Sequence, residues 1–269
     1  MKNLVQIICG CGSAETIEEC ARVPTILDAT IIVVYGIWPR LDHPTEIDPL
    51  KGDSSKWLTP VSQVDNVMEI CNRNNWIFLQ MDNFSYNGAQ YNRALNFILE
   101  NNIPCDHIWF VDGDECIDQE NIDHVLLDVE EMKRQGFDSL RFKNRIEILP
   151  GWKCFRYNVT GGNYGICTGA ALKLRRKEFF DGNFFFESEI PFATTEVPLL
   201  HLHHFRRNAA KRIFNNSWHG GGIVQNLDAC QQLYDSEYTK LLRSKFKAFF
   251  VSDSEDSFYL GAEIYNREC

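Results

Sequence analysis

Residues 107–115 read HIWFVDGDE, an apolar run that passes directly into three carboxylates within four positions. The run is short and rich in aromatic and β-branched residues, so it predicts a buried strand over residues 107–111. In an open parallel sheet, ligands bind beyond the carboxyl ends of the strands. The acids Asp112, Asp114 and Glu115 therefore follow this strand at a position where a ligand is expected.

The chain before this strand alternates short apolar runs with stretches of helical period. This pattern predicts right-handed strand–helix–strand units and a parallel sheet with helices on both faces. The expected strands are residues 4–9, 29–35, 76–80 and 107–111, and the expected helices are residues 15–27, 62–74 and 88–101. Residues 36–60 hold four prolines and exceed an ordinary connection, which predicts a lid or ligand cover.

The pattern changes after the acids, where longer polar segments separate the apolar runs. Residues 119–135 predict a helix, and residues 139–148 alternate like a half-exposed strand. Residues 151–165 are rich in Gly, Asn and aromatics and predict a loop. Further strands are expected at residues 170–174 and 198–203, and a C-terminal helix is expected at residues 227–250.

The composition limits the classes of partner. The chain has 269 residues and a formal net charge of −10, which argues against nucleic acid because that affinity comes from phosphate neutralisation. A small diphosphate is still possible, since a divalent cation can lie between it and carboxylates. No apolar run approaches the roughly 18 residues of a membrane span. The apolar run at the N-terminus is too short for a secretory signal. We expect a cytoplasmic protein whose ten cysteines are free thiols without zinc-site spacing.

The acids themselves suggest a metal site. Gly113 between Asp112 and Asp114 leaves room for a phosphate or ribose and lets both acids turn toward one point. Hard oxygen ligands of this kind suit Mg²⁺ or Mn²⁺. A surface turn is the alternative, because Asp and Gly are common in turns. An EF-hand is excluded, since Cys116 and Ile117 stand where its loop needs Asp or Asn and then Gly.

Residues 87–115, NGAQYNRALNFILENNIPCDHIWFVDGDE, closely resemble the family 2 type of GT-A glycosyltransferase, in which a Gly-Ala…Asn/Arg-Ala helix leads into a strand ending in Asp-x-Asp. The resemblance implies an α/β fold with a mixed, mostly parallel sheet flanked by helices over residues 1–205. Residues 1–115 would be the nucleotide-binding half and residues 116–205 the acceptor half, followed by a helical extension over residues 206–269. The implied activity is metal-dependent transfer of a sugar from a nucleoside diphosphate donor to a glycan or other hydroxyl acceptor, with inversion expected. Retention is the alternative, because GT-A folds host both stereochemical outcomes.

The resemblance also implies roles for single residues. Asp112 would face the ribose and the metal, Asp114 would coordinate the metal, and Glu115 would support the site from behind. The residues implied to bind the donor are Gly10, Gly12, Ser13, Tyr35, Asp82, Arg93, Asp112 and Gly113. Such enzymes often carry Asp soon after the second strand, where this chain has YGIW at residues 35–38, so the nucleotide stays open.

Residues 200–207 read LHLHHFRR and form a second group of interest. In a strand, His201 and His203 share one face and His204 takes the other, so imidazole could reach a metal and Arg206 a phosphate. A late His completes the metal site in many enzymes of this type, and His203 and His204 are the candidates. The alternative is that these histidines are half-buried sheet residues.

An inverting transferase needs a general base that takes the proton from the acceptor hydroxyl. Residues 184–190, FFFESEI, place Glu187 and Glu189 on one face beside an aromatic run. Burial there would raise a carboxylate pKa toward neutrality. These two residues are the candidate bases.

Two other functions remain open. A Mg²⁺-dependent phosphohydrolase of haloacid-dehalogenase type also begins with strand-Asp-x-Asp and would use Asp112 as nucleophile. Such enzymes usually carry Thr or Val where Cys116 stands and place the motif near the N-terminus. A non-catalytic carbohydrate-binding protein on a GT-A scaffold would bind sugar without metal or turnover.

Overall fold

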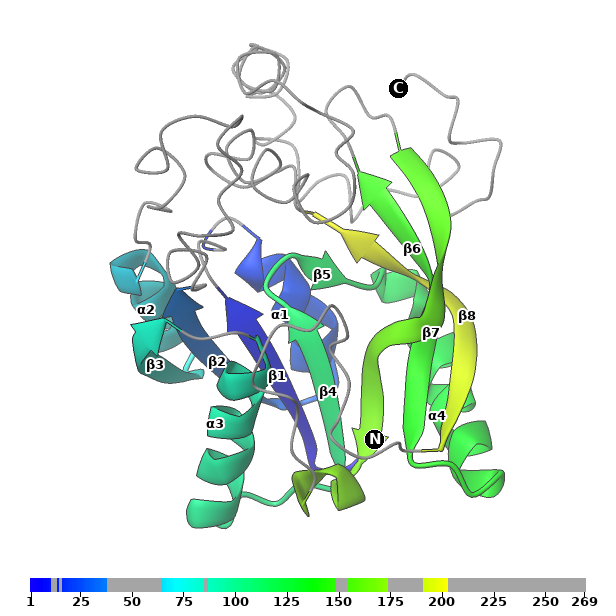
Figure 1. The fold of residues 1–269 in the computed structure, drawn as a ribbon, viewed down its shortest axis with the longest axis horizontal. Coiled ribbons are helices and arrows are strands. Elements are labelled where there is room, and N and C mark those ends of the chain that lie inside the picture. The colour runs from blue at the N-terminus through cyan, green and yellow to red at the C-terminus, as the bar shows by residue number, and fades with distance from the viewer. Residues whose placement is uncertain are drawn as a thin grey trace, which may run out of the picture.

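The structure is a computed structural model that describes residues 1–10, 14, 16–37, 64–84, 87–148, 154–173 and 191–202. One eight-stranded sheet has the order β3-β2-β1-β4-β7-β6-β8-β5 (Figure 1). The elements are β1 (Leu4–Gly10), α1 (Ile17–Ile26), β2 (Thr30–Ile37), α2 (Val64–Arg73), β3 (Ile77–Phe84), α3 (Asn87–Glu100), β4 (His107–Asp112), β5 (Glu115–Cys116), η3 (Gln119–Asn121), α4 (Ile122–Arg134), β6 (Ser139–Ile148), β7 (Cys154–Thr168), η5 (Gly169–Lys173) and β8 (Phe192–His201).

The sheet is mixed and mostly parallel. Four of the seven strand pairings within the described residues are parallel: β1 with β2, β1 with β4, β2 with β3, and β6 with β8. The pairings of β7 with β4 and β6, and of β5 with β8, are antiparallel. The predicted α/β class, with helices on both faces of such a sheet, is confirmed.

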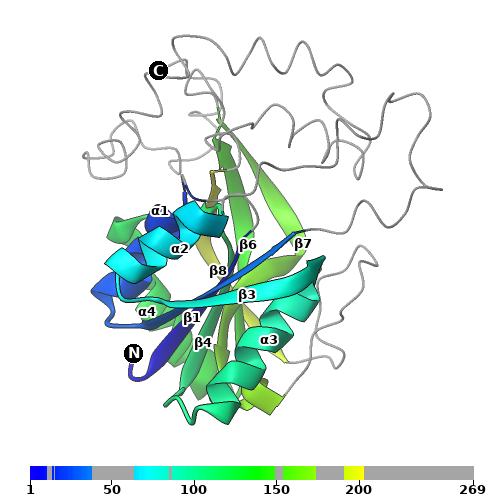
Figure 2. The same cartoon turned by 90° about the vertical axis from the view of Figure 1, so that its left-hand side faces the viewer.

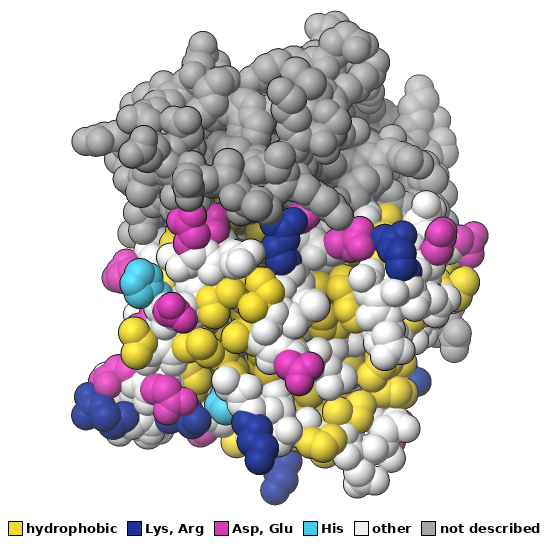
Figure 3. All heavy atoms as spheres, turned by 180° about the vertical axis from the view of Figure 1, so that it is seen from behind, with side chains coloured by type: hydrophobic (Ala, Val, Ile, Leu, Met, Phe, Trp, Pro, Cys, Tyr) yellow, Lys and Arg dark blue, Asp and Glu magenta, His cyan; other side chains and the backbone are white. Residues whose placement is uncertain are grey.

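Side chains that alternate along the strands pack into two apolar layers, one on each face of the sheet. Leu4 and Ile8 of β1 pack on the face covered by α1, α2 and α4, whereas Val5 and Ile7 pack on the face covered by α3 and η5 (Figure 2). The central strands are buried on both faces, as their continuous apolar runs predict. Seen from behind, the face that carries α1, α2 and α4 shows apolar side chains in its middle, with charged residues around them (Figure 3).

One buried polar residue ties β1 to α1. Pro24 lies inside α1 and has no N–H, so the carbonyl of Cys20 lacks its usual helical donor. The Nε2 of Gln6, a fully buried side chain, donates to that carbonyl at 2.9 Å. The β1 side chain therefore supplies the hydrogen bond that the proline removes from the helix.

Every element predicted before residue 112 is present, and the boundaries shift by at most four residues. The largest shift is at β3, which runs to Phe84 instead of residue 80. The helix predicted over residues 119–135 is split into η3 and α4, and β6 has the predicted bounds. Periodicity was sufficient here because these elements bury one face or both.

The loop prediction for residues 151–165 is wrong, because residues 154–168 form β7. This strand runs between β4 and β6 in the sheet: residues 166–168 pair with β4, and Gly165 pairs with Arg141 of β6. A Cβ on Gly165 would lie 1.6 Å from the carbonyl oxygen of Leu140 on β6. The glycine that suggested a loop is thus required by the close approach of a neighbouring strand.

Two smaller predictions also change. The strand expected at residues 170–174 is the 3-10 helix η5, whose Ala171 packs in the layer next to α3. The strand expected at residues 198–203 begins earlier, as β8 starts at Phe192. The helix predicted over residues 227–250 and the extension over residues 206–269 lie outside the described residues.

The structure describes the side chains of six of the ten cysteines and allows its helices to be compared with membrane spans. Among the described residues, six cysteines are free: Cys9, Cys20, Cys71, Cys105, Cys116 and Cys167. Burial raises the pKa of Cys71 to about 12, so this thiol stays protonated at neutral pH. None of the helices within the described residues is both long enough and apolar enough to cross a bilayer.

Candidate functional site

The site begins at the edge where the parallel strands end. Asp112, the last residue of β4, pairs in register with Cys9 of β1, and Gly10 pairs with Tyr35 of β2. The ends of β2, β1 and β4 therefore lie side by side at the upper edge of the sheet (Figure 1). Asp82, in the outer half of β3, belongs to the same edge. Asp112 thus lies at the edge of the sheet where β1, β2 and β3 also end.

Three separate elements hold the main chain of the acidic turn. The N–H of Gly113 donates to the carbonyl of Cys9 in β1 at 2.8 Å. The hydroxyl of Thr16, which immediately precedes α1, donates to the carbonyl of Gly113 at 2.5 Å. The N–H of Leu202, just after β8, donates to the carbonyl of Asp114 at 2.7 Å. A turn bonded on three sides is pre-organised, unlike a turn whose polar groups face water.

Asp112 is partly exposed and is contacted from α3. The hydroxyl of Tyr91 lies 3.3 Å from Oδ1 of Asp112 and donates to it. Tyr91 is fully buried and meets Phe110 edge to face, with ring centroids 5.2 Å apart. Since packing fixes the ring, the hydroxyl also fixes the direction of the Asp112 carboxylate.

Asp114 is only 4% exposed and has a histidine partner. The Nε2 of His201 lies 3.2 Å from Oδ2 of Asp114. The antiparallel pairing of β5 with β8 brings them together, because it sets His201 opposite Glu115. The sequence had grouped His201 with His203 on one strand face but had not selected it. The signal was the His-x-His alternation itself, in which His201 stands two residues before the predicted His203.

Glu115 is fully buried and divides its two oxygens between two partners. Its Oε1 lies 3.1 Å from Nη1 of Arg145 on β6, and its Oε2 accepts from the N–H of Asp112 at 3.4 Å. Sequence reasoning missed Arg145, since nothing near it in the chain links β6 to the acids. An ion pair at this place neutralises a carboxylate that would otherwise be costly to bury.

The donor set fits a hard divalent cation. Asp112 and Asp114 offer carboxylate oxygens from one fixed turn, and Mg²⁺ is commonly bound through one or two carboxylates together with substrate phosphates and water. Within the described residues, no group of three or more His, Cys, Asp or Glu side chains is arranged to hold a metal ion. Two carboxylates suit a cation that shares its coordination with phosphate oxygens and water.

The other predicted donor residues differ in their placement. The ring of Tyr35 is 3% exposed and packs against Phe78 in the core, with centroids 6.5 Å apart. The guanidinium of Arg93 lies 3.8 Å from the carboxylate of Glu100, at the end of α3 that is remote from Asp112. The guanidinium of Arg93 is therefore directed away from Asp112 and Asp114. The remaining predicted residues lie outside the described residues: Gly12, Ser13, Glu187, Glu189, His203, His204 and Arg206.

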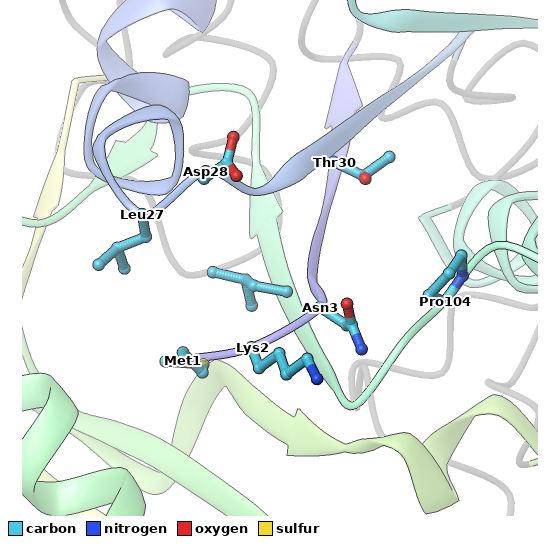
Figure 4. A pocket seen from close by; sticks show the side chains of 8 residues that line it. Met1, Lys2, Asn3, Leu27, Asp28, Thr30 and Pro104 are labelled. Atoms are coloured by element: carbon cyan, nitrogen blue, oxygen red, sulfur yellow. The ribbon is translucent and has the colours of Figure 1, made fainter.

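A pocket of about 500 Å³ lies at the opposite edge of the sheet (Figure 4). Its walls come from the start of β1, the end of α1, the start of β2 and the segment before β4. The lining residues are Met1, Lys2, Asn3, Leu4, Leu27, Asp28, Thr30 and Pro104. None of these is a predicted site residue, so the hollow and the buried acids are separate features of the molecule.

Comparison with known proteins gives only distant similarities. The chain matches no protein-family model and no curated protein. Similar solved structures include S. aureus TarS 1–349, with a TM-score of 0.46 and 14% identity, covering 92% of this chain and 74% of that one. They also include A197 from STIV, with a TM-score of 0.34 and 13% identity over 72% and 81% of the two chains. A glycosyltransferase involved in glycosylating the major capsid of PBCV-1 has a TM-score of 0.27 and 11% identity, over 64% and 62%. Overlaps below a TM-score of 0.5 assign neither a family nor an activity.

Proposed function

We propose that this chain is a metal-dependent glycosyltransferase of GT-A type that moves a sugar from a nucleoside diphosphate donor to a hydroxyl acceptor with inversion. The observation that carries the proposal is the turn of Asp112 and Asp114 at the carboxyl edge, bonded to three other elements. The resemblance of residues 87–115 to such enzymes agrees with it. Buried and oriented carboxylates at a strand-end edge are a common arrangement for ligand binding in α/β proteins.

Asp112 and Asp114 would hold Mn²⁺ or Mg²⁺, and His201 contacts the Asp114 carboxylate. A divalent cation at this place supplies neutralisation of the negative charge that develops on the departing diphosphate. The chain itself orients the carboxylates: Tyr91 directs Asp112, and His201 directs Asp114. His203 and His204 remain candidates for completing the site.

The rest of the site is assigned by role. For the donor, we propose Gly10, Gly12, Ser13, Tyr35, Asp82, Gly113 and Arg206, with Asp112 at the ribose. Glu187 or Glu189 would accept the proton from the attacking hydroxyl, because an inverting reaction needs one base on the acceptor side. Arg93 is left out of this set, since its guanidinium is directed toward Glu100.

A thermal-shift panel tests the proposal. UDP-, GDP- and TDP-sugars are added with Mn²⁺, with Mg²⁺ and with EDTA to the wild type, to Asp114→Ala and to Asp123→Ala, an exposed acid on α4. A ligand at about 100 times its Kd stabilises the native state by about 2.7 kcal/mol, which raises Tm by several degrees. We expect one nucleotide-sugar to do this in a metal-dependent way in the wild type and in Asp123→Ala, but not in Asp114→Ala.

The panel also separates the alternatives. Stabilisation by a simple sugar that survives EDTA and Asp114→Ala would favour the non-catalytic carbohydrate-binding protein. Release of inorganic phosphate from the nucleotide-sugar or a phosphomonoester, without any sugar acceptor, would favour the phosphohydrolase. Transfer of the sugar to an added hydroxyl acceptor, detected by mass spectrometry, is the result that the proposed function requires.

A further inference from the structure

A fully buried carboxylate stands immediately behind the acidic turn. Glu115 is one of only two residues of β5, and its side chain has no exposed surface. A charge in such a place is stable only when it is paired and hydrogen-bonded. The position therefore depends on groups delivered by other strands.

The strand register explains how Arg145 reaches this carboxylate. Arg145 of β6 pairs with Leu199 of β8, and Glu115 of β5 pairs with His201 of the same strand. Residues 199 and 201 of a strand share one face, so Arg145 and Glu115 project from the same face of the sheet. Since strands are spaced about 4.8 Å apart, β6 and β5 are about 10 Å apart with β8 between them. Only a long side chain such as Arg145 can bridge β8 to make the 3.1 Å contact.

The second oxygen of Glu115 connects this ion pair to the acidic turn. It accepts from the main-chain N–H of Asp112 at 3.4 Å, while the first oxygen is held by Arg145. His201, on the same face of β8, contacts Asp114. The guanidinium is thus linked through one carboxylate to the residue at which the metal-binding turn begins.

We propose that Arg145 is a positioning residue for the metal site: through Glu115 it fixes the main chain of Asp112 and hence the spacing of the Asp112 and Asp114 carboxylates. The proposal rests on the proposed function, because it assumes that these two acids bind a divalent cation. Without Arg145, the buried charge of Glu115 loses this ion pair, which favours turning of its side chain toward water. The N–H of Asp112 then loses its acceptor and the turn loosens.

The test measures the binding of Mn²⁺ alone, which is monitored through the electron paramagnetic resonance signal of free Mn²⁺. The Tm of each protein is measured as well. The variants are Arg145→Met, Arg145→Lys and the double variant Glu115→Gln/Arg145→Met, which removes both charges. Lys143→Met is the matched control, because Lys143 lies two residues before Arg145 on β6 and pairs with Glu196 of β8 at an exposed place. We expect the Kd for Mn²⁺ to rise at least about tenfold in Arg145→Met and in the double variant. Arg145→Lys should recover part of the affinity, and Lys143→Met should bind as the wild type does.

The outcomes separate positioning from mere stabilisation. A purely structural role would lower Tm in Arg145→Met while leaving the Kd for Mn²⁺ of the folded protein unchanged, and this result would overturn the inference. If Arg145→Met does not fold, wild-type affinity in the double variant would overturn it equally. If the wild type binds no Mn²⁺, the metal-dependent function fails together with the inference. If Asp114→Ala abolishes binding but the Arg145 variants do not weaken it, only the inference fails.

Discussion

The two edges of the sheet differ in what they hold. At the carboxyl edge, Asp114 and Glu115 are buried, and each contacts a basic side chain, His201 or Arg145. At the amino edge, a pocket of about 500 Å³ is lined by side chains such as Lys2 that need no partner because water solvates them. Burying paired charge costs free energy, whereas an open hollow costs little. Buried acids with assigned partners are therefore a better guide to function in this molecule than cavity volume.

The comparison predicts that single hydrogen bonds matter most at the carboxyl edge. Replacing Thr16 by Val removes the donor to the Gly113 carbonyl at a fully buried position. Leaving a buried acceptor without its donor costs about 1–3 kcal/mol of unfolding free energy, which urea unfolding would measure. The control is Thr25→Val, since Thr25 is exposed and only bonds back to Ala21 within α1. Equal losses in both variants would remove the distinction between a pre-organised turn and an ordinary surface.

At the amino edge, we expect one residue, His107, to make the free energy of unfolding depend on pH. His107 at the start of β4 is 5% exposed, and within the described residues neither ring nitrogen makes a hydrogen bond of normal geometry. Burial, helped by the nearby charge of Lys133, lowers the pKa of His107, and this outweighs the opposing effect of the Lys2 main chain and Asp106. The unfolded chain binds the proton near pH 6.5 and the folded chain binds it only at lower pH, so stability falls as pH decreases below 6.5.

Replacing His107 by Phe removes this titration. We expect the variant to lose less stability than the wild type between pH 7 and pH 5, by at most about 1.4 kcal/mol per pH unit. Urea unfolding at several pH values would measure the difference. The same slope in both proteins would show that His107 titrates alike in the folded and unfolded chains.

The smallest effect is expected at the pocket itself. Lys2→Ala combined with Thr30→Val alters two of its lining residues without touching the acidic turn. The free energy of unfolding should change by no more than about 0.5 kcal/mol. The metal-dependent rise in Tm caused by a nucleotide-sugar should stay the same. If the double variant loses that rise in Tm, the donor binds at the pocket of the amino edge and not at the acidic turn.

Local pattern predicted the half of the fold that positions Asp112. Strands such as β2 and β4 contain continuous apolar runs because both of their faces are buried, and each helix between the strands has one apolar stripe. The DGDE segment could be assigned to a strand end for the same reason, since its acids interrupt a run that must stop at the sheet edge. The pattern failed at β7, where glycine is selected by contact with β6 and local periodicity carries no information.

The sequence by itself determined the strand–helix alternation and the place of Asp112 and Asp114 at the end of a buried strand, because these depend on neighbours within a few residues. Only the tertiary structure decided that Arg145 meets Glu115 and that His201 meets Asp114. These contacts join residues 30 and 87 positions apart in the chain. They exist because β6, β8 and β5 pair in one register, and register is set by burial across the whole sheet.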